Sequence, residues 1–245
     1  MKKILVTFGT PKWYNAKTKL IQTAKQFGLN GCADFDDTKI EPTFYNENSE
    51  IFKYRRGFGY WLWKPYIILK TLEQVDDGDI VFYSDSGSLI VNPLDELFEI
   101  CSKNNGILLF DNRDGTPTEN DIWINKNWTK ADCFIMMNCD TELYHNSNQV
   151  DACYQIYQKN AKSIEFVKQY LKYCQNINII SDLQNINTIR PEFACFRDHR
   201  HDQSVLSLLA ITNNIHIERE PSQWGYRTNS NQSKIKFYHH RNPNI

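Results

Sequence analysis

An acidic turn follows a short apolar run near the end of the first third of the chain. The apolar run covers residues 79–83, and Asp85 comes after it among the small residues Ser84, Ser86 and Gly87. In open α/β sheets, ligands bind at the carboxyl ends of strands. A carboxylate in that place can hold a divalent cation that neutralises a diphosphate. The alternative is that Asp85 hydrogen-bonds its own backbone and only shapes the turn.

A dense polar cluster occupies residues 197–203, just before an apolar pattern with helical spacing. Its two carboxylates, Asp198 and Asp202, suit a helix start, where acidic side chains cap free amides and interact favourably with the helix dipole. Two histidines and two arginines in the same few residues go beyond what capping needs. We expect Asp202, in the first turn of the helix, to face a substrate hydroxyl, and Asp198 to serve as a cap.

The C-terminal tail carries paired histidines, His239 and His240, followed by Arg241. Neutral histidines bind metals and arginines bind phosphates, so this segment suits a clamp that closes over a metal and a diphosphate. The Asn-rich stretch from Thr228 predicts a mobile connection to the clamp. The alternatives are a disordered basic terminus and the remnant of a purification tag.

A fourth candidate lies at residues 55–65, where basic residues flank glycines and tryptophans. Gly57 and Gly59 permit close approach of the backbone to a ligand, and the cation of Lys64 suits a phosphate. Trp61 and Trp63 equally suit core packing by a helix. A diphosphate contact and plain packing both remain open here.

These candidates must be positioned by an alternation of strands and helices. Apolar runs bounded by turn residues predict strands at residues 2–8, 79–83, 106–110, 133–137 and 152–157. Apolar residues at helical spacing predict helices at 16–27, 61–75, 93–102, 163–174 and 203–211. Residues 111–118 predict a loop, and residues 177–190 give no clear prediction. The alternation is typical of a mostly parallel sheet with helices on both faces.

The composition is that of a globular domain with little net charge. The chain has 245 residues and no linker or repeat, so we expect a single domain over residues 1–245. Its 28 basic and 29 acidic side chains give a formal charge of −1, which argues against nucleic acid or an anionic membrane as a partner. Seven cysteines without a C-x-x-C pair suit a reducing compartment. Without a signal or transmembrane pattern, we expect a cytoplasmic location, or the cytoplasmic face of a membrane, in the host cell for a viral protein.

Taken together, the motifs resemble a family of GT-A glycosyltransferases of bacteria and viruses that act in surface polysaccharide synthesis. The matching stretches are residues 57–65, 78–87, 128–134, 200–209 and 239–241, so the resemblance covers nearly the whole chain. It implies the GT-A fold and transfer of a sugar from a nucleotide-sugar donor, such as a UDP- or GDP-sugar, to a glycan or other hydroxyl acceptor. Tyr83 stands where the usual Asp-x-Asp motif has its first carboxylate, so Asp85 alone represents the motif.

The resemblance also implies roles for individual residues. Asp202, with His201 and Gln203, would act on the donor sugar or the acceptor. A divalent metal, Mn²⁺ or Mg²⁺, would be held by Asp85, His239 and His240. The residues expected to contact the nucleotide-sugar are Thr7, Phe8, Tyr60, Trp63, Lys64, Tyr83, Ser84, Asp85, Gln149 and Arg241.

Three alternatives stay open at this point. In an inverting reaction Asp202 would take the acceptor proton, whereas in a retaining reaction it would orient the donor. A nucleotidyltransferase would need a glycine-rich loop after the first strand, and residues 9–12 are too poor in glycine. A non-catalytic carbohydrate-binding or scaffold protein on the same fold would explain the half-lost acidic motif.

Overall fold

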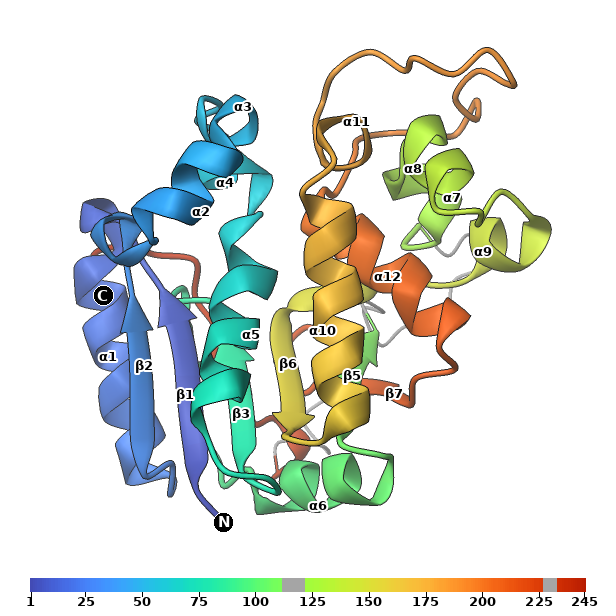
Figure 1. The fold of residues 1–245 in the computed structure, drawn as a ribbon. Helices are drawn as coiled ribbons and strands as arrows, with labels where there is room; N and C mark the ends of the chain where they lie inside the picture. Colours follow the sequence, from blue (N-terminus) through green and yellow to red (C-terminus); the bar gives the residue numbers. More distant parts are fainter. Residues whose placement is uncertain (112–121, 227–232) are drawn as a thin grey trace.

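The protein is described here by a computed structural model, which covers residues 1–111, 122–226 and 233–245. Its main sheet has six strands in the order β2-β1-β3-β6-β5-β7 (Figure 1). The strands are β1 (Lys3–Phe8), β2 (Gly31–Phe35), β3 (Ile80–Ser84), β5 (Ile107–Asp111), β6 (Val150–Gln158) and β7 (Ile217–Arg219). The pairs β1–β2, β1–β3 and β5–β7 are parallel, whereas β6 runs antiparallel to β3 and β5. The predicted mostly parallel sheet is therefore confirmed.

Helices cover both faces of this sheet, as predicted (Figure 1). One face packs against α1 (Tyr14–Gln26) and α6 (Asp95–Lys103), and the other against α5 (Trp63–Gln74), α10 (Ala161–Cys174) and α12 (Asp202–Thr212). Alternate side chains of each strand point to opposite faces, so Leu5 belongs to the first core and Val6 to the second. The central strand β3 is buried along its whole length, as its unbroken apolar run predicts.

The remaining elements are short and lie around the sheet. The short helices are α2 (Pro42–Glu47), α3 (Ser49–Phe52), α4 (Gly57–Tyr60), α7 (Asn125–Trp128), α8 (Ala131–Met136), α9 (Glu142–Asn146) and α11 (Ile177–Ile180). In Figure 1, α2 to α4 lie at the upper left and α7 to α9 at the upper right. A second, two-stranded sheet pairs β4 (Ser88–Ile90) with β8 (Phe237–His239) in antiparallel orientation. Within the described parts of the chain, no helix is long and apolar enough to cross a membrane.

The strand predicted at residues 133–137 is wrong, because these residues belong to α8 and the turn that ends it. A short apolar run with no polar alternation fits a buried helix as well as a buried strand. Cys133 and Phe134 are fully buried on α8, and Asn138 adopts a positive φ of 56° just after the helix. The segment 177–190, which gave no clear prediction, forms α11 followed by a loop. The loop predicted at 111–118 lies almost wholly outside the described residues.

The described end of the tail packs into the fold. Phe237, on β8, is fully buried and stacks on Tyr154 and Phe82, with ring centroids 4.3 and 5.3 Å apart. β8 is fixed further by its pairing with β4, which places His239 opposite Ser88. The mobile connection predicted from Thr228 lies mostly outside the described residues, whereas the described end of the tail is packed into the fold.

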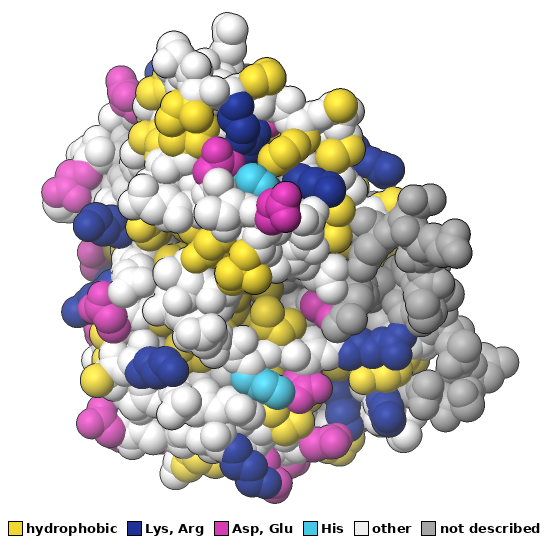
Figure 2. Space-filling model, turned by 90° about the vertical axis from the view of Figure 1, so that its right-hand side faces the viewer, with side chains coloured by type: hydrophobic (Ala, Val, Ile, Leu, Met, Phe, Trp, Pro, Cys, Tyr) yellow, Lys and Arg dark blue, Asp and Glu magenta, His cyan; other side chains and the backbone are white. Residues whose placement is uncertain are grey.

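Charged side chains of both signs lie on the face of the molecule drawn in Figure 2. On the face seen in Figure 2, basic and acidic groups are interspersed rather than gathered by sign, in keeping with the formal charge of −1. A surface of this kind offers no extended field for a polyanion.

Candidate functional site

A cavity of about 730 Å³ opens at the carboxyl ends of β1 and β3. Its wall comes from five parts of the chain: the loop after β1, the turn before α5, the end of β3, the middle of β6, and the segment that leads into α12. The tail after β8 closes one side. This volume lies within the range of small-molecule sites, and the carboxyl ends of parallel strands are where such sites are expected. The lining residues that carry the argument below are Phe8, Trp13, Lys64, Tyr83, Asp85, Arg200, His201, Asp202, Gln203, His239 and Arg241.

A buried ammonium group lies between two carboxylates at the floor of the cavity. Nζ of Lys64 is 2.9 Å from Oδ2 of Asp202 and 3.6 Å from Oδ1 of Asp85. It also donates to the carbonyl oxygen of Ala152 at 3.2 Å. Asp202 accepts a second hydrogen bond from the Tyr170 hydroxyl at 3.0 Å, again through Oδ2. The structure therefore brings Lys64, Asp85 and Asp202 together, as the resemblance implied.

The electrostatics of this group follow from burial and from the mutual contacts. Burial alone would lower the pKa of Lys64, but Asp202 and Asp85 outweigh it and raise that pKa above its ordinary value. Burial raises the pKa of Asp202 despite the nearby ammonium, and Asp85 adds to the rise. Burial opposes ionisation of Asp85 too, yet Lys64 and the Tyr83 hydroxyl, at 2.5 Å, lower its pKa. Lys64 and Asp85 are therefore charged at neutral pH.

His201 and Gln203 flank Asp202 but face different surroundings. The His201 ring donates through Nδ1 to the carbonyl of Ile180 at 2.7 Å and stacks on Tyr60, with centroids 4.8 Å apart. Burial lowers the pKa of His201 to about 4, so the ring is neutral at pH 7. Gln203 accepts from the Ala152 amide at 3.4 Å and donates to Gln149 at 2.7 Å. Both side chains line the cavity.

Four of the predicted contact residues lie behind the cavity wall instead of lining it. Gln149 is fully buried, and its amide donates to the Thr129 hydroxyl at 3.1 Å. Thr7, Ser84 and Tyr60 are buried too. Their places next to true lining residues explain the expectation: side chains alternate along a strand, so Phe8 and Tyr83 face the cavity whereas Thr7 and Ser84 do not.

The aromatic wall is built by a left-handed turn. Residues 57–61 all have positive φ, between 51° and 78°, and three of them are not glycine: Phe58, Tyr60 and Trp61. The Trp61 amide donates to the Gly57 carbonyl, at 3.2 Å, as in one turn of a helix. A Cβ on Gly57 would lie 2.3 Å from the Trp61 ring, so only glycine fits there. This turn directs Phe58 and Trp61 to the cavity, while Trp63 stacks on Phe8 at 3.9 Å.

The tail brings two of its three predicted residues to the cavity. His239 and Arg241 line it, whereas His240 does not and its Nδ1 accepts a bond from the Asn242 amide at 2.9 Å. Burial lowers the pKa of His239, which keeps the ring neutral. Within residues 1–111, 122–226 and 233–245, no three His, Cys, Asp or Glu side chains form a group that could hold a metal ion. The predicted trio of Asp85, His239 and His240 is therefore not gathered.

Asp198 does not cap α12, contrary to prediction. Its carboxylate instead forms an ion pair with Arg56, with Nη2 2.6 Å from Oδ2, and no side chain caps the start of α12. Asp202 does lie in the first turn of that helix, as predicted. The pairing joins residues 142 positions apart, so no local pattern could have revealed it.

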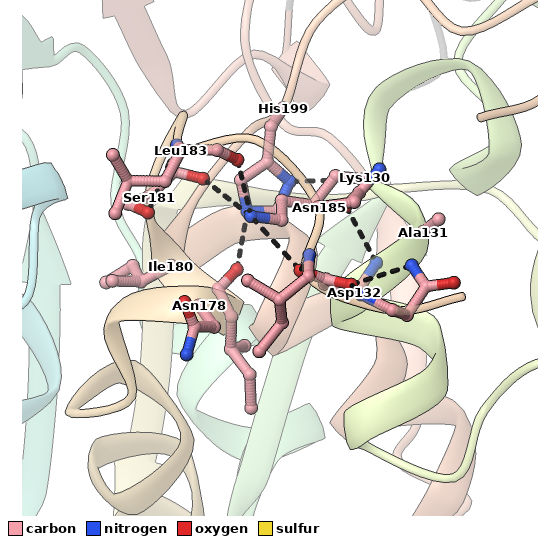
Figure 3. Close-up of polar contacts among 12 residues, drawn as sticks. Lys130, Ala131, Asp132, Asn178, Ile180, Ser181, Leu183, Asn185 and His199 are labelled. Carbon is pink, nitrogen blue, oxygen red and sulfur yellow. Dashed lines mark hydrogen bonds and ion pairs between the residues drawn. The ribbon is translucent and has the colours of Figure 1, made fainter. Parts of the chain in front are cut away.

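A buried polar network fixes the segment that leads to Asp202 (Figure 3). The Lys130 ammonium donates to the carbonyls of Leu183 and Ser181, at 3.0 and 3.3 Å. The Lys130 amide donates to Nδ1 of His199 at 3.3 Å. Asp132 accepts from the Ile186 amide at 2.8 Å. Sequence reasoning missed this anchoring role of Lys130, just before α8, and the contact of Tyr170, on α10, with Asp202, because neither residue has a local chemical signature.

Comparison with known proteins identifies the fold. The sequence matches no protein-family model and no curated protein. Among solved structures, the chain is similar to the apo form of WbbM, described as a bifunctional glycosyltransferase, with a TM-score of 0.55 and 9% identity over 98% of this chain and 45% of that one. It is also similar to a glycosyltransferase involved in the glycosylation of the major capsid of PBCV-1, with a TM-score of 0.51 and 8% identity over 98% and 93% of the two chains.

These likenesses show the GT-A fold. The chain spans less than half the length of WbbM but almost all of the second protein. The order of the sheet, with β6 as its antiparallel strand, agrees with the fold class that the sequence predicted.

Proposed function

We propose that this chain transfers a sugar from a nucleotide-diphosphate-sugar donor, such as a UDP- or GDP-sugar, to a hydroxyl of a glycan or glycoconjugate acceptor. The observation that carries the proposal is the convergence of Lys64, Asp85 and Asp202 on one cavity, at the carboxyl ends of β1 and β3 in a GT-A fold. The two similar structures are glycosyltransferases by their descriptions, which supports the same reaction class.

The donor fits the side of the cavity formed by β1 and the tail. Phe8 and Trp13 offer aromatic surface to a nucleoside. Arg241 and Trp13 both pack against Gly87, and a guanidinium suits a diphosphate. The leaving diphosphate would be stabilised there by charge, which is often the largest single contribution to catalysis.

A divalent metal, Mn²⁺ or Mg²⁺, fits this site only as a two-residue arrangement. Asp85 and His239 line the same cavity, and Nδ1 of His239 is buried without a hydrogen-bond partner. Such ions in phosphate sites are held by few protein ligands, with phosphate oxygens and water supplying the rest. When bound, the ion would neutralise charge on the diphosphate. We assign Asp85 and His239 to it and leave His240 out.

Asp202 has one oxygen free for a substrate hydroxyl. Lys64 and Tyr170 both contact Oδ2, and no described residue donates a hydrogen bond to Oδ1. During transfer, the acceptor oxygen bonds to the anomeric carbon as the bond from that carbon to the diphosphate breaks. In an inverting reaction Oδ1 takes the acceptor proton, and in a retaining reaction it orients the donor sugar. The anomeric configuration of the product distinguishes the two.

A donor-hydrolysis screen tests the proposal. The full chain would be incubated with UDP- and GDP-sugars, with and without Mn²⁺, and release of nucleoside diphosphate measured. We expect slow hydrolysis of one donor, lost in Asp202→Asn and retained in Asp198→Asn, whose carboxylate pairs with Arg56 and does not line the cavity. If the chain bound no donor and hydrolysed none, the proposal would be contradicted. That result would favour a non-catalytic carbohydrate-binding protein.

A further inference from the structure

Arg200 is a cation of the cavity for which residues 1–111, 122–226 and 233–245 supply no carboxylate partner. Its guanidinium stacks over Trp128, 4.3 Å from the ring centroid, and lies 5.8 Å from that of Trp123. Nε is buried and has no hydrogen-bond partner. Among the residues that the structure describes, no carboxylate lies within ion-pair distance of Arg200. Stacking on a ring leaves the edge of a guanidinium available for an oxyanion.

Two other cations of the cavity, Lys64 and Arg56, already have carboxylate partners. Lys64 is paired with Asp202 and Asp85, as described above. Arg56 contacts Asp182 at 3.1 Å and Asp198 at 2.6 Å. Asp198, which is close enough to Arg200 to influence its pKa, is therefore already bound by Arg56.

Arg200 reaches the cavity from the segment that leads into α12, although it is near enough to Arg241 for that second guanidinium to lower its pKa. The donor side is formed by Trp13, after β1, and by Arg241, both of which pack against Gly87. The Arg200 amide instead donates to the carbonyl of Trp128, at 3.0 Å, at the end of α7. α7 contacts α12, which in turn contacts β6. In the sheet, β3 separates β6 from β1. Arg200 is also only two residues from Asp202.

The backbone around Arg200 is held in place before any ligand arrives. Figure 3 shows His199 and Lys130 in the network that anchors the preceding segment. The His199 ring contacts the Ile179 carbonyl at 2.8 Å. The Arg200 amide donates a hydrogen bond to the Ser204 hydroxyl at 3.2 Å. The backbone at Arg200 therefore needs no reordering when a ligand binds, which lowers the entropy cost of binding.

We propose that Arg200 binds a negatively charged group of the acceptor, a carboxylate or a phosphate on a sugar, so that the acceptor is an anionic glycan or sugar phosphate. This inference rests on the proposed function and specifies its acceptor class. An unpaired guanidinium beside Asp202 would otherwise be an unneutralised charge in a half-buried site, and a ligand oxyanion resolves that cost.

Binding of three small sugars tests the inference. Glucose, glucuronate and glucose 6-phosphate would be titrated into the wild-type chain in the presence of UDP, and separately of GDP, with saturation-transfer NMR as the readout. We expect one or both anionic sugars to bind about tenfold more tightly than glucose, as one charge-assisted hydrogen bond allows. The two anions tell a carboxylate-bearing acceptor from a phosphate-bearing one.

Variants tie the effect to this side chain. Arg200→Gln should remove the preference, whereas Arg197→Gln should keep it. Arg197 is a matched control because it lies 5.7 Å from the same Trp128 ring but is exposed and outside the cavity. If Arg200→Gln lowers the melting temperature, Arg200→Lys is used instead. This variant keeps the positive charge and must keep a preference for the anionic sugars.

Three results would overturn the inference: equal binding of the three sugars, binding of none of them, or loss of UDP or GDP binding in Arg200→Gln. The last would place Arg200 in the donor site. Donor hydrolysis by the wild-type chain is measured separately, so a failure of the acceptor assignment is distinguishable from a failure of the transferase proposal.

Discussion

The Nζ atom of Lys64 lies 2.9 Å from Oδ2 of Asp202, in a setting where both side chains are almost fully buried. Lys64 comes from the first turn of α5 and Asp202 from the first turn of α12. One ammonium thus joins the two helices that cover the same face of the sheet. It also reaches Asp85 from β3, at 3.6 Å.

Replacing Lys64 should cost much of the stability of the protein. Lys64→Met leaves the buried Asp202 and the half-buried Asp85 without their cation, and breaking a buried pair in this way costs about 3–5 kcal/mol. The control is Lys70→Met, because Lys70 pairs with Glu41 at the surface, where an ion pair contributes about 0–1 kcal/mol. Urea unfolding of both variants measures the difference. Equal losses would show that the Lys64 contacts add nothing to the fold.

Asp202→Asn should abolish transfer while leaving donor binding intact. The amide still accepts a bond from Tyr170 but no longer accepts a proton, and a lost general base lowers a rate by about 10²–10⁴. Asp198→Asn should transfer normally and lose about 0–1 kcal/mol of stability, since its pair with Arg56 is partly exposed. Transfer rates and donor affinities decide this. An Asp202 variant with near wild-type transfer would remove that residue from the mechanism.

Asp85→Asn should lower donor turnover and remove any stimulation by Mn²⁺. A metal contact contributes several kcal/mol to the transition state, so we expect a loss of about two orders of magnitude. The melting temperature should change little, because Asn still accepts the Tyr83 hydrogen bond. The measurement is hydrolysis against Mn²⁺ concentration. A parallel loss of stability and activity would instead support a turn-shaping role.

Two truncations separate the structural part of the tail from the ligand-binding part. Ending the chain after Ser233 removes the buried Phe237, and loss of such a side chain costs about 3–5 kcal/mol. Ending it after His240 keeps β8 and removes only Arg241–Ile245. The shorter deletion should raise the donor dissociation constant about tenfold with an unchanged melting temperature. Unchanged donor affinity would exclude Arg241 from the site.

Glu220 should make the protein less stable as pH rises. Burial raises its pKa to about 8 from an ordinary 4.5, so between these values the unfolded chain has lost a proton that the folded chain keeps. The folded state binds more protons, and its stability falls with rising pH, by about 1.4 kcal/mol per unit at most. Glu220→Gln can still accept the Ser222 hydrogen bond. Its advantage in melting temperature should grow from pH 5 to pH 8 and reach a plateau above it, and a constant difference would contradict the assigned pKa.

The sequence predicted the framework because long patterns specify it. The unbroken apolar run of β3 and the helical period of α12 were enough to place Asp85 and Asp202 at the ends of their elements. The strand at residues 133–137 failed for the opposite reason. That run is short and apolar on all sides, and burial in α8 satisfies it as well as burial in a sheet would.

Contacts between residues far apart in the sequence could not be predicted from local sequence patterns. The Arg56 pair of Asp198 and the network around Lys130 join segments that meet only in the finished fold. Composition was also a poor guide to the tail. The stretch before it is polar and rich in Asn, but Phe237 is buried in the core and stacks on Tyr154.

The left-handed turn at residues 57–61 ties the cavity to the completion of folding. For residues other than glycine, a left-handed helical conformation costs about 1–2 kcal/mol each, and Phe58, Tyr60 and Trp61 all adopt it. An isolated peptide of this sequence has nothing to offset that cost. In the folded protein, Tyr60 stacks on His201, which is distant in the sequence, and this contact offsets part of the conformational cost. The turn therefore depends on contacts that exist only once α12 has packed against α5, so we expect the aromatic wall to be among the last parts of the cavity to form.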